Sequence, residues 1–210
     1  MRVTIRKVDA NSKRFPTPSP TAPRLGVLIS GRGSNLKAII DAIAEHRLDA
    51  TIALVISNKG DAAGLQHARA AGIETLVLNH RDYPSREDYD RALVDALQKR
   101  LVRLVCLAGF MRLLSPVFIE AFPNRVLNIH PSLLPKYPGL HPQQQALDAG
   151  ATVSGATVHF VNADLDAGPI ILQRQVPVLA GDTAETLAGR ILAVEHALYA
   201  EAIQRVLNGA

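Results

Sequence analysis

The sequence has a single cysteine, Cys106, and this scarcity excludes a disulfide framework or a metal site built from cysteines. Cys106 lies in the apolar run LVCLAG, where a free cysteine usually behaves as a small buried hydrophobe. No apolar run approaches the roughly 18 to 20 residues that a membrane-spanning helix needs, and the N-terminus lacks the order of a secretory signal peptide. We therefore expect a cytoplasmic protein that does not bind a membrane.

The excess of basic residues is confined to the N-terminal end of the chain. Residues 1–24 contain six basic residues and one acidic residue, whereas the remainder contains 17 basic and 18 acidic residues. This nearly neutral body offers little to a nucleic-acid backbone, and we expect no nucleic-acid partner. The prolines and polar residues of FPTPSPTAP predict a disordered basic tail over residues 1–23, followed by a single domain over residues 24–210.

Short apolar runs alternate with longer helical patterns from Leu25 onward, as is typical of βαβ units. The expected strands span residues 25–30, 51–57, 74–78, 101–109, 125–130, 152–161 and 169–179. The expected helices lie near residues 35–44, 62–71 and 85–100, with a terminal helix from about 182 toward 207. The sequence thus predicts an α/β fold with a Rossmann-like, open, mainly parallel twisted sheet and flanking helices.

Two helix starts carry capping signals, and one loop carries many prolines. Ser85 and Asp88 form a capping-box variant for the helix at 85–100. Asp182 and Glu185 form a similar pair for the terminal helix. The segment PSLLPKYPGLHP places four prolines in a dozen residues, which predicts a long ordered loop after the strand at 125–130.

The segment GRGSNL follows an apolar strand and opens a helix. Gly31 and Gly33 can adopt positive φ and let the backbone approach a ligand, while the helix N-terminus supplies free N–H groups. A dinucleotide fingerprint requires a small residue where Leu36 stands, and the Gly-Lys-Ser/Thr ending of a Walker loop is absent. The loop therefore suits a single phosphate, with Ser34 and Asn35 as side-chain donors, or else it is a helix start whose small residues serve packing.

The segment LNIHP places Asn128 and His130 on one face of a strand, at the C-terminal end where open α/β sheets bind ligands. An imidazole exchanges a proton near neutral pH, and an amide can donate to a developing oxyanion. The turn NADLDAG adds Asp164 and Asp166, and a carboxylate beside His130 would stabilise the imidazolium. Spacing does not choose between these aspartates, and both could simply shape a surface turn.

A metal site built from histidines is not expected. His130, His141 and His159 are separated by 11 and 18 residues, and these spacings match no compact ligand motif. His159 alternates with apolar neighbours in an expected strand, which indicates a structural role.

Several segments, in this order, resemble the phosphoribosylglycinamide formyltransferase family of folate-dependent enzymes. They are GRGSNL, LAGFMRLLSP, NIHPSLLPKYPGLH, ATVHFVNADLDAGPIILQ and EHALY, and the resemblance extends over roughly residues 25–200. The resemblance implies transfer of a formyl group from 10-formyltetrahydrofolate to the amine of N1-(5-phospho-D-ribosyl)glycinamide, a step of de novo purine (IMP) biosynthesis. It implies these two small molecules as partners. We expect no metal, and we expect a monomer or homodimer.

The resemblance also implies a role for each matching residue. The catalytic trio corresponds to Asn128, His130 and Asp166, with Asp166 favouring the charged imidazole. The substrate phosphate and ribose correspond to Gly33, Ser34, Asn35 and Glu195. The folate site corresponds to Arg86, Met111, Arg112, Leu113, Leu114, Asn128, Asn162, Ala163, Asp164, Leu165 and Asp166. The family resemblance and the crowded LLPKYPG loop also predict a cis bond between Leu134 and Pro135.

The chain departs from the family pattern in its N-terminal tail, in its end soon after the last helix, and in PQQQ after His141. Methionyl-tRNA formyltransferase and formyltetrahydrofolate hydrolase share parts of the signature, but we expect each to require an additional domain that this sequence does not provide. A non-catalytic nucleotide-binding module is a further alternative. The presence of Asn128, His130 and Asp166 argues against it.

Overall fold

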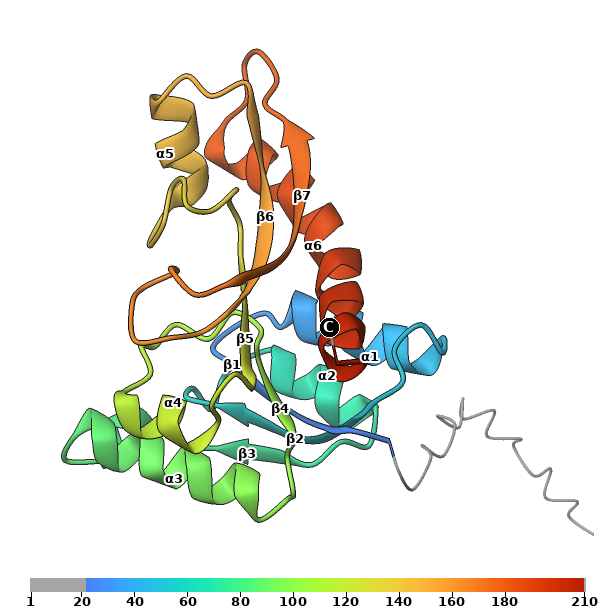
Figure 1. The fold of residues 1–210 in the computed structure, drawn as a ribbon, viewed down its shortest axis with the longest axis vertical. Helices are drawn as coiled ribbons and strands as arrows, with labels where there is room; N and C mark the ends of the chain where they lie inside the picture. Colours follow the sequence, from blue (N-terminus) through green and yellow to red (C-terminus); the bar gives the residue numbers. More distant parts are fainter. Residues whose placement is uncertain (1–21, 210) are drawn as a thin grey trace, which may run out of the picture.

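The computed structural model describes residues 22–209, so the predicted tail lies outside the described residues except for positions 22 and 23. Seven strands form one sheet in the order β3-β2-β1-β4-β5-β6-β7 (Figure 1). The strands are β1 (Arg24–Ile29), β2 (Thr51–Ser57), β3 (Thr75–Val77), β4 (Leu104–Leu107), β5 (Val126–His130), β6 (Val153–Phe160) and β7 (Ile170–Pro177). The helices are α1 (Ser34–Ala44), α2 (Gly64–Ala70), α3 (Arg86–Gln98), α4 (Pro116–Ala121), α5 (Pro142–Asp148) and α6 (Ala184–Leu207), with a 3-10 turn at His80–Asp82.

The sheet is parallel from β3 to β5, and its last two strands are antiparallel. β1 pairs with β2 and β4, β2 with β3, and β4 with β5, whereas β6 turns back along β5 and β7 turns again. The expected open, mainly parallel α/β sheet is therefore confirmed. The strand predicted at 51–57 is matched in full, whereas the one predicted at 101–109 is shorter at both ends, where Leu101 and Gly109 have positive φ angles of 54° and 78°.

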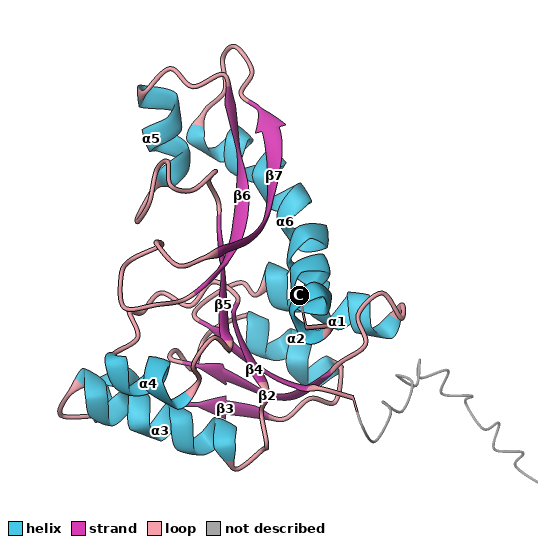
Figure 2. Ribbon diagram, in the orientation of Figure 1, coloured by secondary structure: helices cyan, strands magenta, loops and turns pink. Residues whose placement is uncertain are grey.

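Alternating strand residues build two cores on opposite faces of the sheet. Val27 and Ile29 belong to a first core with α1, α2 and α6, whereas Leu28 between them belongs to a second core with α3 and α4. In β4 the same alternation sends Cys106 to the first core and Leu107 to the second. Successive side chains of a strand point to opposite faces, so strands covered on both faces must be apolar throughout. Figure 2 shows the helices that cover the strands.

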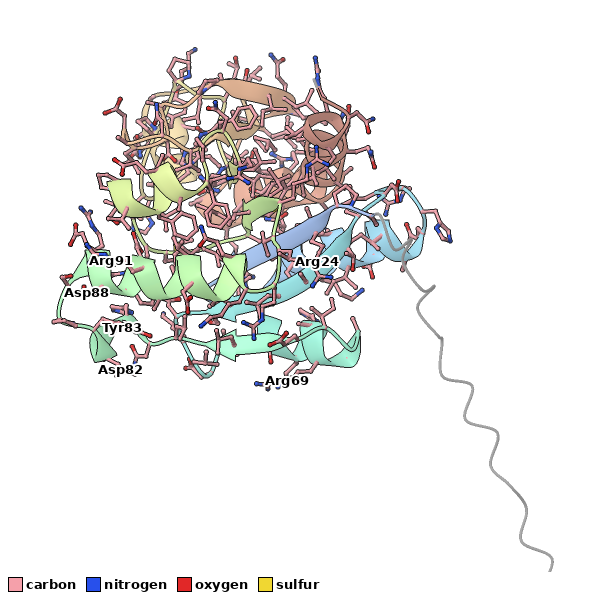
Figure 3. All side chains as sticks on the ribbon, turned by 60° about the horizontal axis from the view of Figure 1, so that its bottom comes forward. Arg24, Arg69, Asp82, Tyr83, Asp88 and Arg91 are labelled. Atoms are coloured by element: carbon pink, nitrogen blue, oxygen red, sulfur yellow. The ribbon has the colours of Figure 1, made fainter. Side chains whose placement is uncertain are left out.

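The start of α3 follows the capping prediction. The N–H of Asp88 donates to Ser85 Oγ at 3.0 Å, which satisfies one of the free donors of the first turn. The Asp88 carboxylate also accepts from Arg91 at 2.8 Å, at the exposed start of the helix (Figure 3). The predicted cap of α3 is confirmed.

The N-cap of α6 lies one residue later than predicted. The pairing of Asp182 with Glu185 is wrong, because Thr183 is the N-cap and exchanges hydrogen bonds with Thr186. The Asp182 carboxylate is engaged elsewhere, 2.6 Å from the guanidinium of Arg190. α6 has 24 residues, yet neither it nor another helix among residues 22–209 is long and apolar enough to cross a bilayer.

The strand order contains a reversal between β1 and β4. From β1 the chain winds outward through β2 and β3, then returns to β4 on the other side of β1. The loops after β1 and β4 therefore leave the same edge of the sheet in opposite directions, and ligands of open α/β sheets bind at such a reversal. β5 ends close by, because Leu107 of β4 pairs with Asn128 of β5.

Candidate active site

The loop after β1 is shaped for a close approach of backbone groups. Gly33 is the N-cap of α1 and has a φ of 73°, a left-handed conformation that favours glycine. A Cβ at this position would stand 2.5 Å from the Cα of Gly64, so the available space also requires glycine. The N–H of Gly64 fixes the loop by donating to the carbonyl of Gly31 at 3.0 Å. α1 has neither a side-chain cap nor an acidic residue in its first turn, so its first N–H groups are open to an anion.

Asn35 and Glu195 form a buried pair that ties the start of α1 to α6. Asn35 Nδ2 donates to Glu195 Oε2 at 2.8 Å. Burial raises the pKa of Glu195, and the hydrogen bond from Asn35 opposes part of this rise. Ser34, half-buried at the first position of α1, lies next to this pair in the chain. The structure thus brings the residues predicted for the phosphate and for the ribose together at one helix start.

His130 ends β5 with both ring nitrogens close to oxygen atoms. The side chain is buried, with Nε2 at 2.9 Å from the carbonyl oxygen of Tyr137 and Nδ1 at 3.4 Å from Asp166 Oδ2. A carbonyl oxygen only accepts hydrogen bonds, so Nε2 carries a hydrogen. The proton that the ring gains or loses is therefore the one on Nδ1, which faces the carboxylate.

Asp166 is the aspartate of the turn NADLDAG that faces His130. Its Oδ2 accepts from the N–H of Gly139 at 2.9 Å. Its backbone has a φ of 50°, a conformation that is uncommon outside glycine and that the surrounding contacts must hold in place. Asp164 is exposed, and its N–H closes a local turn on Asn162 Oδ1 at 3.1 Å. Geometry therefore distinguishes two aspartates that spacing alone does not.

His159 joins this cluster, although its apolar neighbours predicted a structural role. Asn128 and His159 are register partners in the ladder of β5 and β6. Asn128 Nδ2 lies 3.3 Å from His159 Nε2 and 3.5 Å from Asp166 Oδ1. His159 Nδ1 lies 2.9 Å from the carbonyl oxygen of Phe160 and donates to it. In the neutral ring Nε2 therefore accepts from Asn128, whereas in the protonated ring the Nε2–H faces Asp166 Oδ1 at 3.7 Å. The register between the two strands is the signal that would have identified His159, and the sequence does not contain it.

The charge of Asp166 is stabilised from several sides. Burial would raise the pKa of this carboxyl group, but the contacts with His159 and with the N–H of Gly139 lower it. When the His130 or His159 ring is protonated, its positive charge acts in the same direction, and together these contacts hold the pKa of Asp166 below its usual value. An ionised carboxylate is therefore maintained beside His130.

The loop after β5 supplies two backbone groups to the cluster. Its predicted cis bond between Leu134 and Pro135 is present and is confirmed. Tyr137 and Gly139 have positive φ angles of 59° and 76°. At these turns the Tyr137 carbonyl comes to His130 and the Gly139 N–H comes to Asp166. The proline-rich segment is thus an ordered loop, as its composition predicted.

The residues predicted for a folate site lie on two loops and one helix start. In the segment after β4, Met111 and Leu113 are exposed, Arg112 is half-buried, and Leu114 packs against the second core. The turn after β6 carries Asn162, Ala163, Asp164 and Leu165 next to Asp166. Arg86 is exposed at the first position of α3, with its guanidinium 3.7 Å from Glu87, so the structure does not bring it into the His130 cluster.

Metal ligands do not assemble in the described part of the chain. Residues 22–209 contain no group of three or more histidine, cysteine, aspartate or glutamate side chains arranged to hold a metal ion. The cluster of two imidazoles, one amide and one carboxylate is instead equipped to hold a proton and to orient polar atoms.

Comparison with known proteins identifies one family. A family model described as formyl transferase matches residues 23–203. The phosphoribosylglycinamide formyltransferase of Escherichia coli (strain K12) is 51% identical over 183 residues, which cover 87% of this chain and 86% of that protein. A trifunctional purine biosynthetic protein adenosine-3 of Drosophila pseudoobscura pseudoobscura is 52% identical over 189 residues, but this chain spans only 14% of its length. The crystal structure of glycinamide ribonucleotide transformylase 1 from Symbiobacterium toebii has a TM-score of 0.89 and 54% identity, over 91% of this chain and 90% of that chain.

Proposed function

The chain belongs to the formyl transferase family, and from that premise we propose that it transfers the formyl group of 10-formyltetrahydrofolate to the amine of N1-(5-phospho-D-ribosyl)glycinamide. It is a one-carbon transferase, and its similarity to proteins of purine biosynthesis assigns the reaction to that pathway. The observation that carries the proposal is the buried contact between His130 Nδ1 and Asp166 Oδ2, 3.4 Å apart at the end of β5.

The proposed reaction needs one proton to move between two nitrogen atoms. The glycinamide amine attacks the formyl carbon, the formyl oxygen becomes an oxyanion, and the bond from carbon to the folate nitrogen then breaks. The amine loses a proton as the folate nitrogen gains one, so no proton is consumed overall. Nδ1 of His130 is the ring nitrogen that can exchange a proton, and the carboxylate of Asp166 stabilises the imidazolium during that exchange. His130 or an ordered water carries the proton.

Oxyanion stabilisation is assigned to the protonated His130 and to the Asn128 amide. The Asn128 N–H that points at Asp166 makes a contact of 3.5 Å, which is long for a hydrogen bond. An oxyanion beside Asn128 would offer this N–H a better acceptor, whereas the other N–H stays with His159 at 3.3 Å. In this proposal the Asn128 amide donates a stronger hydrogen bond as negative charge develops on the formyl oxygen. An interaction that strengthens toward the transition state lowers the reaction barrier.

The two substrates are assigned to the two loops that flank the sheet reversal. The first turn of α1, with Gly33, Ser34 and Asn35, is proposed to bind the phosphate of the ribonucleotide, and Glu195 its ribose hydroxyls. The segment at 111–114 and the turn at 162–166 are proposed to bind the folate, because exposed apolar side chains beside backbone polar groups suit a flat heterocyclic ring. Arg86 is proposed to meet an anionic group of the same ligand.

We also propose that residues 24–210 act as one catalytic domain, in the cytoplasm, as a monomer or homodimer without nucleic-acid or membrane partners. Both proposed substrates are small and water-soluble, so the reaction requires no further partner. Sedimentation of the purified protein with and without both substrates tests the assembly state, and a stable higher oligomer would contradict it.

The proposal is tested by following the absorbance change when 10-formyltetrahydrofolate becomes tetrahydrofolate, with and without the ribonucleotide. We expect conversion only when the ribonucleotide is present. Conversion without it would indicate a hydrolase, and no conversion in either case would refute formyl transfer to this acceptor.

A further inference from the structure

The segment from Gly109 to Ser115 joins β4 to α4 and carries the side chains proposed to bind the folate. Two of these side chains have few neighbours of their own, because Met111 is 65% exposed and Leu113 is 59% exposed. Side-chain packing therefore does not determine where they point. The course of the backbone at 109–115 must be fixed by other contacts.

Ser30 fixes the first half of the segment. This buried residue follows β1 and directly precedes Gly31, the first residue of the loop at 31–35 that is proposed to bind the substrate phosphate. Its N–H donates to the carbonyl of Gly109 at 3.1 Å, and its Oγ accepts from the N–H of Met111 at 2.8 Å. One residue thus holds the backbone on both sides of the turn that begins the segment.

Asp90 fixes the end of the segment from another element. It lies on α3, and its Oδ2 accepts from the N–H of Ser115 at 2.5 Å. Both residues are almost fully buried, at 1% and 0% exposure. Burial raises the pKa of Asp90, and the N–H of Ser115 opposes part of the rise. A buried carboxylate is costly for a fold, and this cost is offset in part by the hydrogen bond that fixes the backbone at Ser115.

We propose that Asp90 and Ser30 are positioning residues for the formyl donor, which hold the segment at 109–115 in the course that presents Met111 and Leu113 to the folate. The inference rests on the proposed function, because it assumes that this segment binds the donor. Neither Asp90 nor Ser30 needs to touch the substrate. Loss of either anchor should therefore weaken donor binding while the phosphate loop and the His130 cluster remain assembled.

Steady-state kinetics of D90A, D90N and S30A against wild type test this inference, with KM measured separately for the two substrates. In D90A the N–H of Ser115 loses its acceptor, and we expect the KM for 10-formyltetrahydrofolate to rise about tenfold. The KM for the ribonucleotide should stay within about twofold, because that substrate is bound by other elements. D90N keeps an oxygen that accepts from Ser115 and should return the donor KM toward the wild-type value.

The matched control is D95A, which removes an exposed carboxylate from the same helix and breaks only its surface pair with Lys99. D95A should leave kcat and both KM values unchanged. A D90A protein with unchanged donor KM would overturn the inference, as would a loss of kcat with both KM values unchanged, which would mean only a smaller folded fraction. If D90A fails to fold, the donor KM of S30A is the test: a raised value supports the inference and an unchanged value overturns it. Wild-type protein that transfers no formyl group would overturn the proposed function itself. If the wild type is active and the donor KM of D90A is unchanged, only the present inference fails.

Discussion

The loop at residues 31–35 is assembled from neighbours in sequence, whereas the cluster around His130 collects side chains from separate segments between residues 128 and 166. The loop depends on backbone conformation, with Gly33 at a φ of 73° and free N–H groups at the start of α1. The cluster depends on side chains, with Asp166 and His159 brought to His130 and Asn128 by strand pairing and by a folded turn.

Because of this difference, the loop and the cluster should respond differently to substitution. A site made of backbone groups tolerates many side-chain changes but does not tolerate a residue that cannot adopt its conformation. A site made of converging side chains loses its chemistry when one functional group is removed, even if the backbone is undisturbed. Substitutions in the two regions should therefore affect different kinetic parameters.

The largest effect should follow His130→Ala. We expect kcat to fall by about 10² to 10⁴, the usual contribution of a positioned acid or base, while the dissociation constant of the ribonucleotide changes little. Ser34→Ala, at the other end of the proposed site, should mainly weaken ribonucleotide binding. Steady-state kinetics with binding titrations measure both, and the opposite pattern would refute the assignment of roles.

Gly33→Ala should break the loop through its backbone. The new Cβ would be held at a positive φ and would approach the Cα of Gly64 to 2.5 Å, so we expect the free energy of unfolding to fall by about 1 to 3 kcal/mol. Ribonucleotide affinity should fall with it. Gly31→Ala is the control, because a Cβ there meets nothing within 4 Å. Urea unfolding compares the two variants, and equal stability would show that the loop does not depend on the conformation of Gly33.

His159→Asn tests whether the His159 imidazole contributes to the function of the cluster around His130. Without the imidazole, the Asn128 amide loses its acceptor at 3.3 Å. We expect kcat to fall about tenfold, the effect of one buried hydrogen bond of about 1.4 kcal/mol, with little change in either KM. His67→Asn on α2 is the matched control. An unchanged kcat would return His159 to the structural role that the sequence predicted.

The smallest effect concerns Glu195, whose pKa is raised chiefly by burial. A raised folded pKa means that the ionised carboxylate opposes folding at pH values above its ordinary pKa of 4.5. Glu195→Gln removes this charge and offers an N–H to the side-chain amide oxygen Oδ1 of Asn35, which is buried without a partner among the described residues. The variant should be more stable than wild type at pH 7, and its advantage should shrink as the pH falls from the raised pKa of Glu195 toward 4.5.

Urea unfolding at several pH values measures this difference, with the exposed Glu120→Gln as control. Ribonucleotide binding by Glu195→Gln should weaken even as stability rises. A variant that is less stable than wild type at pH 7 would contradict the account of a strained buried carboxylate.

Much of the fold could be predicted because its signals are local. The apolar runs that became β1, β2 and β5 are bounded by polar or flexible residues, and Ser85 marks the start of α3 directly. The cap of α6 was predicted one residue early, because Asp182 and Thr183 both have capping side chains. In the structure the Asp182 carboxylate instead accepts from Arg190 and from the N–H of Leu179, and Thr183 is the cap. The short helix α4 carried no periodicity long enough to predict it.

The candidate site likewise contains residues that local sequence signals predict and residues that only the tertiary structure brings together. Gly33 and its free helix start could be read from six consecutive residues, whereas the choice between Asp164 and Asp166 depends on how a turn folds back onto β5. Family resemblance selected Asp166, and the geometry places that residue at His130. His159 was predicted to have a structural role, because alternation along a strand gives the face of a side chain but not the partner strand or its register.

The most direct test of the central claim follows the formyl group itself. The protein is incubated with 10-formyltetrahydrofolate labelled on the formyl carbon and with the ribonucleotide, and the label is then quantified in the nucleotide product and in free formate. The account predicts one label on the glycinamide nitrogen for each tetrahydrofolate formed, and a loss of this transfer in His130→Ala. Label recovered as formate, or retained in the folate while the ribonucleotide stays unmodified, would contradict it.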